Sequence, residues 1–286
     1  MRKPLLLAIW IAVSGCLTPL VAGEQAPSKP RSPAGRILFS SNRSGPWRIW
    51  TVRADGSELR EITQGGPNDN DVDPVWSPDG KQILFSSTRG SGVGTWRMAA
   101  DGSRMERICD GDQAEWSPDG KRIALRRQEQ ILVRELATGQ ERRVSPADWP
   151  HCSGPAWSPD GKRIAFACRW DAGNGVFLVP AEGGSPQKVY DRKGACEPHW
   201  SPDGQRLVYE TETQICTIQP DGKKNRIVTF FGGVQHYGRF SPDGQWIVFC
   251  QGSSERGPWE LYAIPADGGS PVQITQGGSD MYPDWR

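Results

Sequence analysis

Short apolar segments recur along the chain, and each is introduced by a polar turn. Examples are residues 83–85, 164–166 and 247–249. Each of these runs is separated by two residues from a preceding Ser-Pro-Asp-Gly sequence. Proline presets φ at the second turn position, aspartate tolerates the third, and glycine takes the left-handed conformation that closes the turn. Apolar runs of this length between turn signals are typical of β-strands. The pattern therefore predicts an all-β protein of short antiparallel strands.

The turn sequence is periodic. Ser-Pro-Asp-Gly begins at residues 77, 117, 158, 201 and 241, so the spacings are 40, 41, 43 and 40, and a degenerate copy occupies 32–35. A second turn signal, most often Asp-Gly, lies between successive copies, as at 55–56, 101–102, 221–222 and 267–268. Six repeats of this length, each with two hairpin turns, predict a six-bladed β-propeller of four-stranded blades.

An aromatic residue precedes each Ser-Pro pair, and the same position recurs at the end of the chain. These residues are Trp76, Trp116, Trp157, Trp200, Phe240 and Trp285. Repeated flat side chains are expected to wedge between neighbouring sheets. Segment 280–285 matches the inner strand 71–76. We therefore expect the C-terminal strand to complete the first blade and leave no open sheet edge.

The N-terminal residues have the character of a targeting segment. Arg2 and Lys3 precede the apolar stretch 5–13, which is too short to span a bilayer. Cleavage before Cys16, in a sequence that resembles a bacterial lipobox, would make a lipoprotein anchored through Cys16; cleavage near residue 23 would release a soluble protein. We predict a signal peptide over 1–23, a Pro- and Ser-rich tether over 24–34, and a propeller over 35–286. The expected location is the periplasm or the outer membrane.

Composition narrows the class of protein further. The 286 residues are 36% hydrophobic and 23% charged with a net charge of +1, and no concentrated basic face favours nucleic-acid binding. Six cysteines besides Cys16 allow up to three disulfides in an oxidising compartment, with cross-blade pairing and buried free thiols both open. The absence of any Cys-x-x-Cys pair argues against a zinc ribbon or a thioredoxin-like site.

Particular phrases in these repeats resemble those of the TolB family. Residues 74–81 (PVWSPDGK) carry the resemblance, as do 39–43 (FSSNR) followed by 53–57 (RADGS), and the pattern covers 36–286. The resemblance implies a propeller that grips a protein partner at one end of its channel, without the N-terminal α/β domain of TolB. We therefore expect a monomeric, non-catalytic envelope protein whose partner is a protein or peptide, and no membrane contact except a lipid anchor.

Residues that lead into the inner aromatics are candidates for the channel rim. The candidate binding residues are Asp71, Asp73, Asp112, Glu197, His236, Asp280 and Tyr282. Such an acidic funnel could bind calcium, because oxygen ligands suit this ion. It could instead receive a cationic or hydrogen-bonding segment of a partner, or consist only of hydrated rim charges. The segment 68–73 (NDNDVD) offers alternating oxygen ligands but lacks the glycine and glutamate of an EF-hand.

The three histidines decide whether an enzyme is plausible. His151, His199 and His236 each precede an inner aromatic, and their convergence would favour a metal-assisted carbohydrate lyase or hydrolase, as in oligogalacturonate lyases with this repeat. Their offsets from the aromatics are six, one and four residues, so a shared strand register is not expected. The chain has no Gly-x-Ser-x-Gly nucleophile elbow. The sequence therefore favours a binding function and assigns no catalytic residue.

Overall fold

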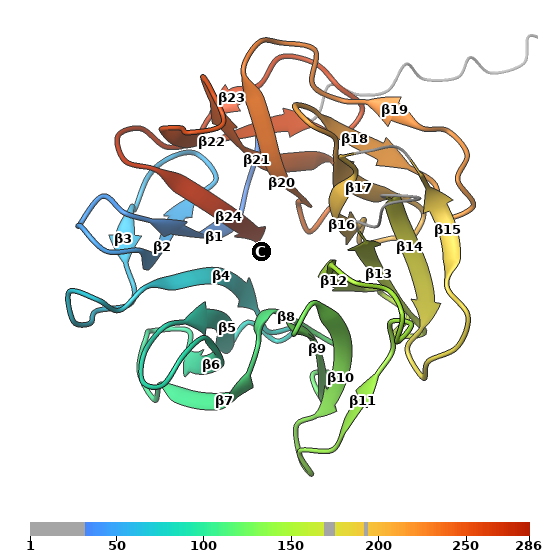
Figure 1. Ribbon diagram of the computed structural model, residues 1–286. Coiled ribbons are helices and arrows are strands. Elements are labelled where there is room, and N and C mark those ends of the chain that lie inside the picture. The colour runs from blue at the N-terminus through green and yellow to red at the C-terminus, as the bar shows by residue number, and fades with distance from the viewer. Residues whose placement is uncertain (1–31, 169–174, 192–193) are drawn as a thin grey trace, which may run out of the picture. The chain divides into compact units, whose positions relative to one another are not determined.

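The computed structural model describes residues 32–168, 175–191 and 194–286. In these ranges, 24 strands form six antiparallel sheets of four strands each. The sheets stand in a ring around a central axis, with one strand of each sheet facing that axis (Figure 1). The predicted six-bladed propeller is confirmed. Within the described ranges, no helix has the length and apolar character needed to cross a membrane.

Each blade contributes four strands in order from the axis outward. The inner strands are β24 (Asp280–Trp285), β4 (Asp71–Trp76), β8 (Asp112–Trp116), β12 (Cys152–Trp157), β16 (Cys196–Trp200) and β20 (Val234–Phe240). The second strands are β1 (Arg36–Ser41), β5 (Gln82–Ser87), β9 (Arg122–Arg127), β13 (Arg163–Cys168), β17 (Leu207–Glu210) and β21 (Trp246–Gly252). The third strands are β2 (Arg48–Arg53), β6 (Gly94–Ala99), β10 (Gln130–Glu135), β14 (Gly175–Pro180), β18 (Ile215–Ile218) and β22 (Trp259–Pro265). The outer strands are β3 (Arg60–Glu61), β7 (Glu106–Asp110), β11 (Glu141–Arg143), β15 (Gln187–Tyr190), β19 (Arg226–Ile227) and β23 (Val272–Gln273).

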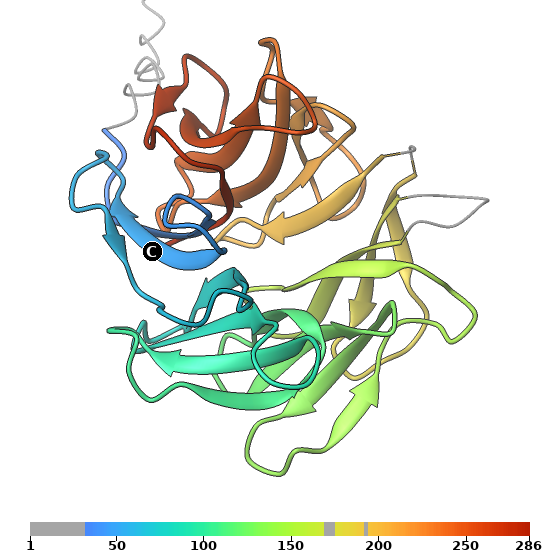
Figure 2. The ribbon, with the colours of Figure 1, turned by 60° about the vertical axis from the view of Figure 1, so that its left-hand side comes forward.

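The two ends of the propeller meet in blade one. β24 pairs antiparallel with β1, and Ile37 lies opposite Trp285 while Ser41 lies opposite Asp280. The red C-terminal strand lies beside the blue N-terminal strands in both views (Figures 1 and 2). The predicted closure by the C-terminal strand is therefore confirmed.

The Ser-Pro-Asp-Gly turns are held by a repeated set of side-chain bonds. In blade two, the Ser77 hydroxyl donates to Asp79 at 2.7 Å and accepts from the backbone N–H of Gln82 at 2.9 Å. Gly80 has φ of +64°, in the left-handed region. The bonds from Ser77 and from the Lys81 backbone hold the pKa of Asp79 below its usual value. The turn aspartates are thus structural, and their abundance carries no information about acid–base chemistry.

The repeated aromatics pack against the blade that precedes their own. Trp157 joins a cluster with Ala124, Ile131 and Val133 of blade three. The guanidinium of Arg122, also from blade three, lies 4.7 Å from the centre of a Trp157 ring. These aromatics are therefore buried between neighbouring sheets and hold adjacent blades together, as predicted.

A β-bulge interrupts every inner strand at the same point. In β4, for example, Val72 lies opposite Ser86 but Val75 lies opposite Leu84, so one strand advances three residues while its neighbour advances two. The same shift occurs in the other five inner strands. The extra residue disrupts the side-chain alternation that a regular strand would keep.

Two groups of predictions concern the cysteines and the N-terminus. No disulfide bond joins any two of the six cysteines that the structure describes. The sulfurs of Cys152 and Cys168 lie 3.7 Å apart, and both residues belong to blade four, so this contact is not a cross-blade staple. The signal peptide over 1–23, the Cys16 lipid anchor and the tether up to residue 31 fall outside the described residues.

Candidate functional site

The extra residue of each bulge lines the channel. It lies three positions before the inner aromatic of its blade, and its φ is between +49° and +58° in all six blades. The six residues are Asp73, Gln113, Gly154, Glu197, Tyr237 and Tyr282, here called the bulge ring. All six line one cavity of about 30 Å³. Each of the six inner strands thus places the residue at this one position next to the channel axis.

The bulge ring stores backbone strain. Left-handed backbone costs a residue with a Cβ about 1–2 kcal/mol, and five of the six ring positions carry a side chain. The glycine in blade four has a local reason, because a Cβ on Gly154 would come within 2.9 Å of the Glu197 carboxylate. Strain repeated at one level of a channel, with polar and aromatic side chains, is typical of a functional surface.

Contacts across the channel connect ring members from different blades. The Gln113 side-chain oxygen accepts from the Gly154 backbone N–H at 3.1 Å, and its amide nitrogen donates to Glu197 at 3.4 Å. The Tyr237 and Tyr282 ring centres lie 4.3 Å apart. The bulge ring therefore has two chemically different sides. One side consists of amide and carboxylate groups, and the other consists of the two paired phenol rings.

The ring carboxyl groups ionise with difficulty. Burial and the neighbouring Asp112 carboxylate raise the pKa of Asp73 to about 6. Burial and the Glu210 carboxylate raise the pKa of Glu197 to about 7. Neither residue has an ion-pair partner among the described residues within 4 Å. Both groups therefore change charge near neutral pH, where small changes in surroundings alter their protonation.

A second set of charged residues lies next to the inner aromatics. Glu115 and Arg239 line the same cavity as the bulge ring. Burial and the Arg239 charge lower the pKa of His199, whose Nε2 is 3.6 Å from Glu115. Burial and Glu115 raise the pKa of Asp284 to about 7. The Nε of Arg239 and both ring nitrogens of His199 lack a hydrogen-bond partner in the described part of the chain.

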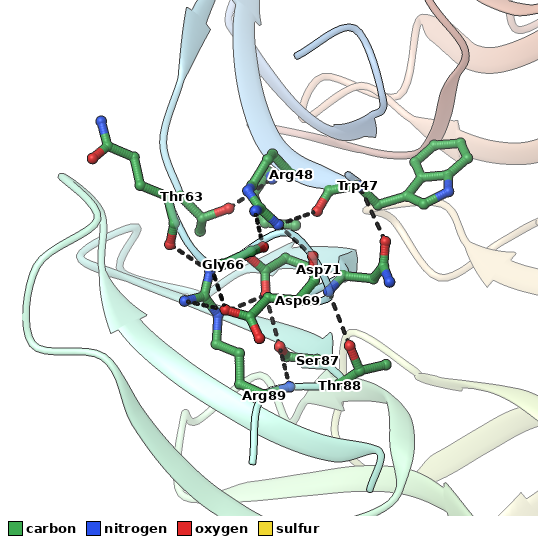
Figure 3. Close-up of polar contacts among 12 residues, drawn as sticks. Trp47, Arg48, Thr63, Gly66, Asp69, Asp71, Ser87, Thr88 and Arg89 are labelled. Carbon is green, nitrogen blue, oxygen red and sulfur yellow. Dashed lines mark hydrogen bonds and ion pairs between the residues drawn. The ribbon is translucent and has the colours of Figure 1, made fainter. Parts of the chain in front are cut away.

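Other predicted rim residues belong to ion pairs within blades. Asp71 is fully buried and accepts from Arg89 at 2.6 and 2.9 Å and from Ser87 at 2.7 Å (Figure 3). Asp280 is fully buried beside Arg43 in blade one. Asp112 forms a bidentate pair with Arg126. The structure thus separates these three aspartates from the cavity that Asp73, Glu197 and Tyr282 share.

Comparisons with known proteins agree with this geometry. The family model described as TolB beta propeller domain matches residues 24–130 and 113–286. The chain belongs to this family. No curated protein matches.

Among solved structures, TolB from Acinetobacter baumannii is similar with a TM-score of 0.76 and 19% identity, over 90% of this chain and 67% of that one. A putative TolB from Agrobacterium tumefaciens has a TM-score of 0.67 and 20% identity, over 87% and 92% of the two chains. An oligogalacturonate lyase in complex with manganese has a TM-score of 0.55 and 15% identity, over 88% and 75%. At these identities the similarity establishes the fold alone.

The three histidines of this TolB-family propeller do not converge. His151 pairs with Glu129, while His199 faces Glu115. His236 lies between two carboxylates, and Glu210 and Glu255 outweigh the effect of burial to raise its pKa. No group of three metal-ligating side chains occurs in the residues that the structure describes. The histidine arrangement proposed for a metal-assisted lyase is therefore not formed.

The acidic segment 68–73 is also committed to internal contacts. The Asp69 carboxylate accepts from the Gly66 backbone N–H at 2.7 Å and lies 3.7 Å from Arg89 (Figure 3). Arg48 donates to the carbonyl groups of Gly66 and Asp69, which ties the loop to blade one. The carboxylates of Asp69 and Asp71 therefore already have cationic partners. Calcium binding in the channel stays a prediction.

Sequence reasoning missed several channel residues. Gln113, Tyr237, Glu115 and Arg239 line the cavity but are not among the predicted binding residues. A usable signal was present, because counting back three residues from each inner aromatic identifies the complete bulge ring. The signal was blurred because the position of a bulge cannot be found from apolar–polar alternation.

Proposed function

We propose that this protein is a non-catalytic binding module of the cell envelope, and that the channel mouth beside the bulge ring receives a protein or peptide partner. The observation that carries the proposal is the bulge ring itself: five strained, polar or aromatic side chains meet at one level of the channel. Strain and unpaired carboxyl groups lower stability, so their presence favours a role in recognition.

The size of the cavity favours a partner that docks at the mouth. Pockets for small organic ligands usually hold about 300–1,000 Å³, whereas the free volume among the ring side chains is about 30 Å³. That volume suits a few water molecules and not a sugar residue. A docked partner can instead place one or two side chains against the carboxyl and phenol groups. A hydrogen-bonding or cationic side chain matches Asp73 and Glu197.

The location in the envelope is part of the same proposal. Its support is the apolar stretch 5–13 with two preceding basic residues, followed by Cys16. The family relationship is consistent with this location.

Site-specific photo-crosslinking tests the proposal directly. A photoreactive phenylalanine replaces Gln113 in one version and the exposed turn residue Asp221 in a matched control, and each is irradiated in envelope extract of the source organism. We expect a defined partner band from position 113 only, and we expect Asp73→Asn with Glu197→Gln to weaken it at least fivefold. No band from position 113, or equal bands from both positions, would refute docking at the channel.

The carbohydrate alternative is tested in parallel. The protein is incubated with oligogalacturonate and either manganese or calcium, and unsaturated product is followed by ultraviolet absorbance. We expect no turnover above a boiled control. Metal-dependent turnover that Glu197→Gln abolishes would replace the binding proposal with the lyase.

A further inference from the structure

Blade two fastens its inner strand to the next strand with a buried polar latch. Asp71, the first residue of β4, lies opposite Ser87 of β5. Its carboxylate accepts from the Ser87 hydroxyl and from two guanidinium nitrogens of Arg89, two residues further along (Figure 3). The backbone N–H of Asp71 donates to Trp47 of the preceding blade. It therefore does not bond across to Ser87, and the two residues form a non-hydrogen-bonded pair.

Blade one has the same three residue types at the corresponding positions. Asp280 is the first residue of β24 and lies opposite Ser41 of β1, and Arg43 follows two residues later. The Arg43 guanidinium donates to Asp280 at 2.5 Å, and the Asp280 carboxylate is fully buried. The Ser41 hydroxyl accepts from Arg43 Nε at 2.9 Å, and Asp280 Oδ1 has no hydrogen-bond partner among the described residues. The two blades thus share a buried aspartate–arginine pair, and the direct serine–aspartate bond belongs to blade two.

Blade four has two cysteines at the first two of these positions. Cys152 begins β12 and lies opposite Cys168 of β13. In the sequence, a tryptophan stands two positions after Cys168, whereas an arginine stands two positions after Ser41 and after Ser87. The exposed fractions of Cys152 and Cys168 are 0% and 1%. A pair of sulfurs needs no counter-ion and suits this burial.

The backbone places the two sulfurs for bond formation. The Cys152 N–H donates to Glu129 of the preceding blade, as that of Asp71 donates to Trp47. The pair is therefore non-hydrogen-bonded, the type in which facing side chains are closest in an antiparallel ladder. The sulfurs are 3.7 Å apart. A disulfide bond is about 2.05 Å long, so each sulfur needs to move by roughly 0.8 Å.

We propose that Cys152 and Cys168 form a disulfide in the exported protein, as a covalent latch in place of the ionic one. One thiolate attacks a disulfide of a thiol–disulfide exchange partner and forms a mixed disulfide. The second thiolate then displaces the partner's sulfur, so the S–S bond forms as the partner's disulfide is reduced to a dithiol, which takes up the two protons that the cysteines lost. Because both sulfurs are buried in the fold, exchange takes place while blade four is folding, and the finished bond is shielded from reductants.

The latch lies close to the bulge ring. Gly154, two residues after Cys152, donates its N–H to Gln113 and leaves the space that Glu197 occupies. Holding the start of β12 therefore holds one side of the channel. The proposal itself rests on the cysteine geometry and is independent of whether a partner binds there.

Peptide mapping of the full chain, produced by export in an oxidising compartment, tests the bond. Free thiols are blocked under denaturing conditions, and the protein is digested with trypsin without reduction. We expect peptide 144–162 linked to peptide 164–169, with a mass two hydrogens below the sum of the two. Blocked thiols at both positions, or a link from either cysteine to another residue, would overturn the proposal.

Thermal unfolding supplies a second, independent readout. The bond closes a 17-residue segment from Cys152 to Cys168, for which loop-closure entropy predicts a Tm change of about 5–10 °C in a domain of this size. We expect reductant added during refolding to lower the wild-type Tm by that amount, and to leave the Cys152→Ser, Cys168→Ser double variant unchanged. The control Cys109→Ser, altered at a half-exposed cysteine of blade two, should respond like the wild type. An equal response of the double variant to reductant would contradict the latch.

Discussion

Replacing Glu197 by glutamine should stabilise the propeller, and most strongly at neutral and alkaline pH. The pKa of this carboxyl group is raised from 4.5 to about 7, chiefly by burial. Below pH 4.5 the group is protonated in both the folded and the unfolded chain, so it contributes no pH dependence there. Between pH 4.5 and 7 the unfolded chain releases the proton while the folded chain retains it, and the free energy of unfolding falls as the pH rises. Above pH 7 the full cost of the buried charge is present.

The size of the effect follows from the pKa change. A difference of 2.5 units, from 4.5 to about 7, corresponds to about 3.4 kcal/mol at about 1.4 kcal/mol per unit. The Glu197 side chain is partly exposed, and a partly exposed charge is screened by solvent, which lowers this figure. We therefore expect Glu197→Gln to raise the free energy of unfolding by about 1–2 kcal/mol at pH 8 and by much less at pH 4.5. The glutamine retains the size of the side chain and its contact with Gln113.

Denaturation with urea at pH 4.5 and pH 8, followed by tryptophan fluorescence, measures this difference. Glu212→Gln is the matched control, because Glu212 is an exposed carboxylate of the same blade. The control should shift the midpoint equally little at both pH values. A Glu197→Gln variant that is less stable than the wild type at pH 8 would refute the reasoning, because the charge would then be stabilised by its surroundings. The confirmed result would show that the channel retains a charge at the expense of stability, as expected of a functional site.

Three further changes test the fold, the ionic latch and the anchor. Deletion of residues 280–286 removes the inner strand of blade one and should lower the Tm by more than about 10 °C or prevent folding; a truncated chain that melts like the wild type would contradict closure by β24. Arg89→Leu leaves the buried Asp71 charge without its partner and should cost about 3–5 kcal/mol in chemical denaturation, much of which the double variant Arg89→Leu, Asp71→Leu should recover if the loss comes from the orphaned charge. Cys16→Ser should move the protein from the membrane to the soluble fraction after cell lysis, and a wild-type protein that is already soluble and begins near residue 24 would show that Cys16 is not an anchor.

The blade architecture was predictable because its causes are local. The hydrogen bonds of each Ser-Pro-Asp-Gly turn join residues within five positions of one another. The conformation of the turn can therefore be predicted from these residues alone. The closure at Trp285 was predictable for the same reason, since segment 280–285 repeats the pattern of 71–76. Burial of the inner aromatics followed from their regular spacing.

The channel was less predictable because its lining depends on the bulge. A regular strand would alternate side chains between two faces, whereas the extra residue brings Asp73 to the axis and the ladder keeps Asp71 buried beside Arg89. Nothing in the local sequence distinguishes the roles of these two aspartates. Only the tertiary structure separates the structural one from the one that faces the channel.

The sequence by itself determined six blades, their turns, their aromatic wedges and the strand that closes the ring, because repeats and turns are encoded within a few neighbouring residues. The tertiary structure alone decided which side chains meet. It brought Gln113 to Glu197 across 84 positions of sequence, kept the three histidines apart, and set Cys152 opposite Cys168 where two other blades have aspartate and serine. Such encounters depend on bulges, registers and the curvature of the ring, which act over the whole propeller and leave no local signature.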